Sequence, residues 1–214
     1  MKFAVIVASQ RPASQSAKVG RAISAALAAL DPTHEVYTLD LGAHPLPLWD
    51  EGKWQAGSAW GAVWGPVSAE LKGADAVVLI TPEWSGMATP AAKNLLLLCD
   101  AGELAHKAGL IVSVSSGRGG SYPVAELRMS SYKNTRVCWI PDHLIIREVG
   151  AEVREPALLA EGALLAEGEG GEPLAPTLSE ERLRFCVETL CVYAEGLGAV
   201  RGRLPRDDRF RNGL

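Results

Sequence analysis

The chain has 214 residues, of which 48% are hydrophobic and 21% are charged, and this balance is typical of a globular protein rather than a disordered one. Its 21 Lys and Arg residues against 25 Asp and Glu residues give a formal net charge of -4, which argues against a broad basic surface for nucleic acid. The length favours one large domain over residues 1–214.

No segment of the sequence points to export or to a membrane. The N-terminal apolar run, Phe3 to Val7, is too short for the core of a signal peptide. No segment approaches the roughly 18 continuous apolar residues that a membrane span requires. The four cysteines fit neither a zinc motif nor a disulfide framework, so we interpret them as reduced thiols within apolar runs. We therefore expect a cytoplasmic protein that binds neither nucleic acid nor a membrane.

Short apolar runs without strict alternation recur along the chain and predict strands that are buried on both faces. They are Phe3 to Val7, Val36 to Leu39, Ala76 to Ile80, Leu110 to Val114 and Val137 to Ile140. Segments of helical spacing lie between these runs, as in the stripe of Val19, Ile23, Leu27 and Leu30. Strands that alternate with helices predict an α/β fold, in which a parallel sheet is covered by helices on both faces.

Capping signals mark where further helices begin. Thr89 is followed by Pro90, and proline suits the first position of a helix. Thr177 and Glu180 fit a capping box, which predicts that a last helix begins there. Ser121 can start another helix between these two.

Two stretches lie outside the predicted strands and helices. Residues 151–176 are rich in Glu, Gly, Ala and Pro, so we expect a surface loop there, with room for a short helix over 156–165. The basic residues 201–214 are most simply a solvated C-terminal tail. The sequence indicates no function for either stretch.

The loop between the first predicted strand and the first helix is rich in hydrogen-bond donors. It contains Ser9, Arg11, Ser14, Gln15 and Ser16 and no acidic residue. A helix N-terminus attracts phosphate, and an arginine can add charge-assisted hydrogen bonds. Because the loop matches neither GxGxxG nor GxxxxGK[ST], the phosphate of a mononucleotide is favoured. The alternative is an ordinary capped turn, in which Ser14 or Ser16 caps the helix and Arg11 is solvated.

A second loop follows the third predicted strand. It contains Pro82, Glu83, Trp84, Ser85 and Gly86. Its proline and glycine shape a turn, and its tryptophan offers an aromatic surface to a flat heterocycle. The alternative is a connecting turn with a partly buried tryptophan.

A third loop follows the fourth predicted strand and contains Ser116, Gly117, Arg118 and Gly119. Its glycines would let backbone N–H groups approach a ligand closely, although a plain flexible loop is the alternative. In open α/β sheets, ligands bind in a crevice at the carboxyl ends of the strands. Three such loops on adjacent strands therefore predict one shared binding crevice.

The first loop resembles the phosphate loop of the NADPH-dependent FMN reductase family, which has the pattern GSxRxxSxN. Ser9, Arg11 and Ser14 stand at its Ser, Arg and Ser positions, whereas Ala8 replaces the usual Gly and Ser16 the usual Asn. The resemblance extends over roughly residues 2–196.

The second loop is similar to the TPEYN loop of the same family and is its most specific match. Residues 81–85 read TPEWS, so that Trp84 stands in place of Tyr and Ser85 in place of Asn. Residues 90–94 resemble the PxxLKN segment that follows in the family. The run from Gly117 to Gly120 is similar to the family's third loop.

The resemblance implies a flavodoxin-like, doubly wound, five-stranded parallel sheet of order 2-1-3-4-5. It also implies bound FMN, NADPH or NADH as co-substrate, and a small electron acceptor such as a quinone, azo compound, free flavin or metal ion. We expect a homodimer or higher homo-oligomer, since the family's flavin site lies near a dimer interface. The residues named in the three loops are the expected cofactor-binding residues, and no catalytic side chain is assigned.

Two other functions remain open at this stage. One is a flavodoxin-like electron carrier that does not oxidise a pyridine nucleotide. The other is a flavin-free binding module on the same fold, because Ala8, Ser16 and Ser85 depart from the family pattern. The four histidines show no metal-binding spacing, and no metal is expected.

Four tryptophans gather between the second and third predicted strands, at Trp49, Trp54, Trp60 and Trp64. Tryptophan is favoured at protein interfaces. These side chains could roof the flavin, cover a partner subunit or pack locally within a loop.

Overall fold

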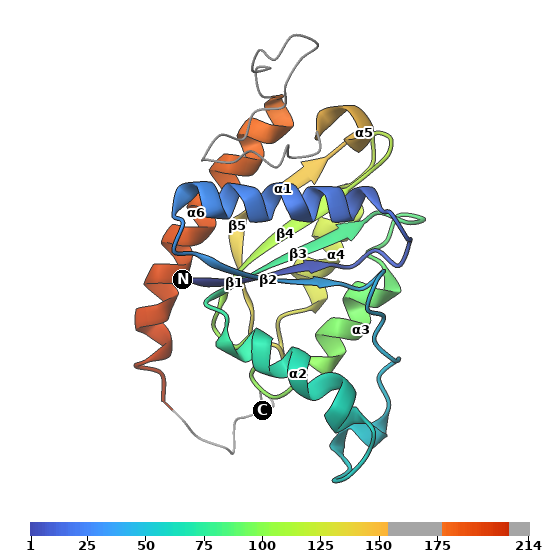
Figure 1. The fold of residues 1–214 in the computed structure, drawn as a ribbon, viewed down its shortest axis with the longest axis vertical. Helices are drawn as coiled ribbons and strands as arrows, with labels where there is room; N and C mark the ends of the chain where they lie inside the picture. The colour runs from blue at the N-terminus through green and yellow to red at the C-terminus, as the bar shows by residue number, and fades with distance from the viewer. Residues whose placement is uncertain (154–176, 206–214) are drawn as a thin grey trace.

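The centre of the molecule is a five-stranded parallel sheet in the order β2-β1-β3-β4-β5 (Figure 1). This computed structural model describes residues 1–153 and 177–205. The strands are β1 Lys2–Val7, β2 Glu35–Asp40, β3 Ala76–Pro82, β4 Ala108–Val114 and β5 Cys138–Ile146. This strand order is that of the flavodoxin-like doubly wound fold. The predicted fold class and strand order are confirmed.

Helices cover both faces of the sheet (Figure 1). They are α1 Gln15–Leu30, α2 Trp60–Gly73, α3 Pro90–Leu98, α4 Ser121–Ser130, α5 Val149–Glu152 and α6 Leu178–Arg201, with a short 3-10 helix, η1, at Glu51–Trp54. The buried side chains of α1 and α6 join the hydrophobic cluster on one face, and those of α2, α3 and α4 join the cluster on the other.

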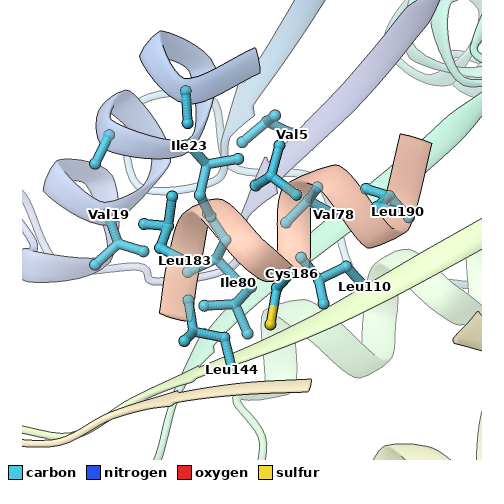
Figure 2. Packing of buried hydrophobic residues seen from close by; sticks show 14 of the residues in the cluster. Val5, Val19, Ile23, Val78, Ile80, Leu110, Leu144, Leu183, Cys186 and Leu190 are labelled. Carbon is cyan, nitrogen blue, oxygen red and sulfur yellow. The ribbon is translucent and has the colours of Figure 1, made fainter. Parts of the chain in front are cut away.

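Each central strand contributes side chains to both hydrophobic clusters, because successive side chains point to opposite faces of the sheet. In β1, Val5 faces α1 and α6, whereas Ala4 and Ile6 face α2 and α3. Figure 2 shows the first of these clusters, in which Ile23 of α1 and Cys186 of α6 lie among strand side chains. Burial on both faces explains why the strands read as continuous apolar runs.

The predicted helix starts agree with the structure. The Thr89 side chain caps α3 and Pro90 follows at its first position. Thr177 and Glu180 form the complete capping box at the start of α6. Helix α4 begins at Ser121, but its N-cap residue is a glycine that offers no side chain.

The connection between β2 and β3 is more ordered than the sequence suggested, because it contains η1 and α2. Gly61, Gly65 and Pro66 lie inside α2, and these residue types weaken any helical signal in a sequence. Trp60 and Trp64 lie one turn apart on α2 and are buried in the core. Of the roles considered for the tryptophans, the structure supports local packing for Trp60 and Trp64. They pack from a helix rather than from a loop.

Strand β5 is longer than the predicted run from Val137 to Ile140, since it continues to Ile146. Pro141, Asp142 and His143 interrupt the apolar pattern, so the sequence did not predict that the strand continues beyond them. Pro141 lies opposite the register irregularity between Gly109 and Ile111 of β4, and β5 is an edge strand; both circumstances accommodate a proline.

The two stretches expected at the surface are only partly described. Helix α5 takes in the first two residues of the expected loop 151–176, and α6 extends to the first residue of the expected tail 201–214. Residues 154–176, with the expected helix over 156–165, and residues 206–214 lie outside the described residues.

Candidate functional site

The three loops singled out in the sequence leave neighbouring strands at one edge of the sheet. The first loop (residues 8–16) follows β1, the second (residues 83–88) follows β3, and the third (residues 115–120) follows β4. Strand β3 lies between β1 and β4, and all three strands run parallel (Figure 1). Their carboxyl ends therefore bring the three loops together, where open α/β sheets bind ligands.

The first loop ends in the capped N-terminus of α1. The Ser14 hydroxyl accepts a hydrogen bond from the Ala17 amide at 3.1 Å, so Ser14 is the cap and the buried Ser16 is not. Ser9 is buried, and its hydroxyl accepts a hydrogen bond from the Arg11 amide at 3.4 Å. The Arg11 side chain is exposed and has no hydrogen bond or ion pair within the described residues.

These groups fit a phosphate. The amides of Gln15 and Ser16 open the first turn of a 16-residue helix, where N–H groups have no acceptor inside the helix. Ser9 and Ser14 accept hydrogen bonds from backbone amides and can still donate their hydroxyl protons. With the guanidinium of Arg11 added, the donors suit a dianion at this position.

The second loop makes a two-residue hairpin turn. Trp84 and Met87 exchange backbone hydrogen bonds of 3.1 and 3.0 Å. Between them, Ser85 and Gly86 have φ angles of 50° and 70°, as a type I′ turn requires. The ring of Tyr122 packs beside Gly86, since an added Cβ there would lie 3.8 Å from it. Tyr122 was not among the site residues predicted from the sequence, where the only signal is its position two residues after the glycine run.

The positive φ of Ser85 leads to a first prediction. Asn tolerates this conformation better than Ser does, and a β-branched side chain tolerates it poorly. Ser85→Asn is expected to raise the free energy of unfolding by a few tenths of a kcal/mol, and Ser85→Val to lower it by about 1 kcal/mol. Urea denaturation of both variants measures this, and equal stabilities would contradict the turn geometry.

A carboxylate joins the second loop to the third. Glu83 Oε2 accepts hydrogen bonds from the Gly120 amide at 2.6 Å and the Tyr122 amide at 3.3 Å. The Glu83 amide in turn donates to the Val114 carbonyl. Pro82 before it is buried and paired with Val114 in the sheet, so it belongs to the wall behind the loop.

Residues that follow β5 hold backbone carbonyls of the third loop, while residues 116–118 of the loop are exposed. The Gly117 carbonyl accepts a hydrogen bond from the Glu148 amide, and that of Arg118 accepts one from the Arg147 side chain. Arg118 lies 3.7 Å from the Glu148 carboxylate in an exposed ion pair, a kind of pair that contributes little to stability. Ser116 and Gly117 are exposed, and an added Cβ at Gly117 would touch nothing within 4 Å.

Buried threonines tie the second loop to the first. The Thr89 hydroxyl, which caps α3, also donates to the Ala8 carbonyl. The Thr89 amide donates to the Thr81 hydroxyl at 3.1 Å. The cap was evident from the sequence, but its contact with a residue 81 positions away was not.

Lys93 and Asn94, which the family resemblance had pointed to, support the site from α3. Lys93 pairs with Glu126 of α4 at 2.9 Å, and Glu126 also accepts the Ala88 amide at 2.7 Å. Burial raises the pKa of the Glu126 carboxyl, but these two hydrogen bonds and the positive charge of Lys93 together lower the pKa below its ordinary value. The Asn94 side chain accepts a hydrogen bond from the Trp49 amide and donates one to the Pro47 carbonyl.

The outer tryptophans lie away from the three loops. Trp49 and Trp54 meet edge to face at 5.1 Å. Both line a cavity of about 570 Å³ whose other walls include Leu96 and Leu97 of α3 and Leu127 of α4. None of the residues that line this cavity belongs to the three loops.

Other kinds of site find no support in residues 1–153 and 177–205. No group of three or more His, Cys, Asp or Glu side chains there could hold a metal ion. The four cysteines are free, and burial raises the pKa of the Cys99 thiol well above its ordinary value. No helix in these residues is both long and apolar enough to cross a membrane.

Comparison with known proteins adds a family and a set of similar folds. Residues 1–150 match the family model described as NADPH-dependent FMN reductase. A search of curated proteins found no match.

Three solved structures illustrate the shared fold. An oxidoreductase from Corynebacterium diphtheriae is 16% identical with a TM-score of 0.65, over 91% of this chain and 97% of that one. The apo form of an NADH:FMN oxidoreductase (EMOB) is 14% identical with a TM-score of 0.61, over 99% and 94%. An azoreductase from Bacillus anthracis str. Sterne is 16% identical with a TM-score of 0.54, over 91% and 99%. At these identities the likeness establishes the fold alone.

Proposed function

The chain belongs to the NADPH-dependent FMN reductase family, and we propose that it binds FMN at the three loops and reduces it with NADPH or NADH. The observation that carries this proposal is the first loop, which contains hydroxyls, the amides of a helix N-terminus and an unpaired arginine and no acidic residue. The second and third loops stand beside it on adjacent strands. Together they offer a phosphate site next to a wall for a flat ring.

The phosphate would lie at the start of α1. Ser9, Arg11, Ser14, Gln15 and Ser16 supply its donors, through side chains or backbone amides. The loop lacks the glycine pattern of a dinucleotide site, which is why FMN rather than FAD is proposed.

The ring would lie against the second and third loops. When bound, FMN would accept a hydride from the nicotinamide and pass electrons to a small acceptor. Trp84, Gly86 and Tyr122 can flank a flat ring, and backbone N–H groups near Gly119 can stabilise negative charge on it. No acid or base side chain is needed for hydride transfer, so no catalytic side chain is proposed.

The acceptor is proposed only as a class: a quinone, an azo compound, a free flavin or an oxidised metal ion. A cytoplasmic location is part of the proposal, because four free thiols suit a reducing compartment. The competing functions are an electron carrier that binds FMN without oxidising a pyridine nucleotide, and a flavin-free binding module.

One experiment separates the three functions. The purified protein is titrated with FMN, freed of excess flavin, and treated with NADPH or NADH under anaerobic conditions while absorbance near the flavin maximum is followed. The reductase binds FMN and bleaches. A yellow protein that does not bleach is the carrier, and a protein that retains no FMN even from an excess is the flavin-free module.

We also propose a homodimer that uses the cavity lined by Trp54 and Leu97. These side chains are 65% and 61% exposed, although both are large and apolar. Light scattering is expected to give a dimer for the wild type and a monomer for Leu97→Asp. Leu30→Asp, at an exposed leucine at the end of α1, is the matched control and should remain dimeric. A monomeric wild type would refute the dimer and leave the FMN site untouched.

A further inference from the structure

Glu83 holds the third loop from outside that loop. Its Oε2 atom accepts the amides of Gly120 and Tyr122, which open helix α4. The N-cap residue of α4 is Gly120, which has no side chain with which to cap the helix. A carboxylate of the second loop therefore performs the capping that an Asp or Ser at the N-cap position would normally provide.

The third loop is shaped to receive this carboxylate. An added Cβ at Gly119 would lie 2.6 Å from Glu83 Oε1. Gly120 adopts a φ of 109°, and its amide donates a hydrogen bond to Glu83 Oε2 at 2.6 Å. Gly119 therefore makes room for the Glu83 side chain, and Gly120 supplies the amide that the side chain accepts.

We infer that Glu83 is a positioning residue of the FMN site rather than a direct flavin ligand; this inference rests on the proposed function. Its Oε2 accepts hydrogen bonds from two amides and its Oε1 lies against Gly119, so the third loop fixes the orientation of the carboxylate. Holding the start of α4 keeps the third loop at a fixed distance from the second. Without this link, the loop amides that would face the ring are no longer preorganised.

The test compares Glu83→Ala and Glu83→Gln with a matched pair at Glu180. Glu180 also accepts a backbone amide in a helix cap, at 2.9 Å from Thr177, but it lies at the start of α6 and outside the three loops. Two quantities are measured: amide hydrogen exchange in the FMN-free protein, and the dissociation constant for FMN. Thermal unfolding establishes that each variant is folded.

Glu83→Ala is expected to raise amide exchange at Gly120 and Tyr122 about tenfold and to weaken FMN binding about tenfold, because two amides lose their acceptor. Glu83→Gln keeps a side chain of the same length with an oxygen that can accept the two amide hydrogen bonds. Its amide exchange rates and FMN dissociation constant should therefore stay within about fivefold of the wild type. The Glu180 variants should change neither property.

Two results would overturn the inference. Unchanged exchange at Gly120 and Tyr122 in Glu83→Ala would mean that the carboxylate does not hold the loop. Faster exchange with unchanged FMN affinity would mean that the held loop does not position FMN. If the wild type itself binds no FMN, the proposed function fails and the positioning of FMN fails with it, while the exchange data still decide whether Glu83 holds the loop.

Discussion

Gly120→Ala is expected to lower the free energy of unfolding by about 2–4 kcal/mol, which is the largest effect on stability that we predict. A Cβ at this position would lie 2.5 Å from Cγ2 of Ile145 on β5 and 3.5 Å from the Ser113 hydroxyl. The backbone there has a φ of 109°, which side chains rarely adopt. Overpacking and backbone strain therefore act at the same residue.

Gly117→Ala is the matched control, because it lies in the same loop with nothing within 4 Å of its added Cβ. Its free energy of unfolding should stay within about 0.5 kcal/mol of the wild type. Both variants are measured by urea denaturation without FMN. Equal stability of Gly120→Ala and Gly117→Ala would show that the third loop does not pack on β5 as described. A loss of stability in Gly120→Ala but not in Gly117→Ala would explain why the residue just before α4 is a glycine.

Arg11→Ala is expected to weaken FMN binding between about 10-fold and 100-fold, which is the largest effect on binding that we predict. The guanidinium is exposed and has no partner in the described residues, so its removal costs the protein little stability. It lies in the loop that enters α1, where a bound phosphate would receive both its charge and the helix amides. Titration of FMN fluorescence measures the dissociation constant.

Two further variants sharpen this prediction. Arg11→Lys should recover part of the affinity, because a lysine keeps the charge but not the paired N–H donors of arginine. Ser9→Ala should weaken binding less than Arg11→Ala, since it removes a neutral donor. Arg203→Ala, at an exposed arginine after α6, should change nothing. Unchanged affinity in both Arg11→Ala and Ser9→Ala would place the phosphate elsewhere in the molecule.

The parts of the fold that could be predicted are those with local causes. A buried parallel strand needs apolar side chains on both faces, and the runs that contain Val5 and Val78 carry that signal by themselves. The caps at Thr89 and Thr177 are formed by residues within three positions of each other. The place of the three loops followed in the same way, because parallel connections send the carboxyl ends of the strands to one edge.

The parts that could not be predicted depend on distant residues. Helix α2 contains three glycines and a proline, and it is held in place by Trp60 and Trp64 packing on the sheet rather than by its own propensity. Strand β5 contains a proline and polar residues, which its edge position and its irregular register accommodate. Neither context is visible in a window of ten or fifteen residues.

The features of the candidate site also differ in whether they depend on local sequence or on distant residues. The sequence by itself determined the α/β class, the three loops and their residue types, because apolar periodicity, glycine and capping chemistry act over a few residues. Only the tertiary structure decided the roles within the site: Ser14 caps a helix, Arg11 is left unpaired, and Glu83 joins two loops across 37 positions of chain. Such contacts form only when the sheet brings distant segments together, so no local pattern encodes them.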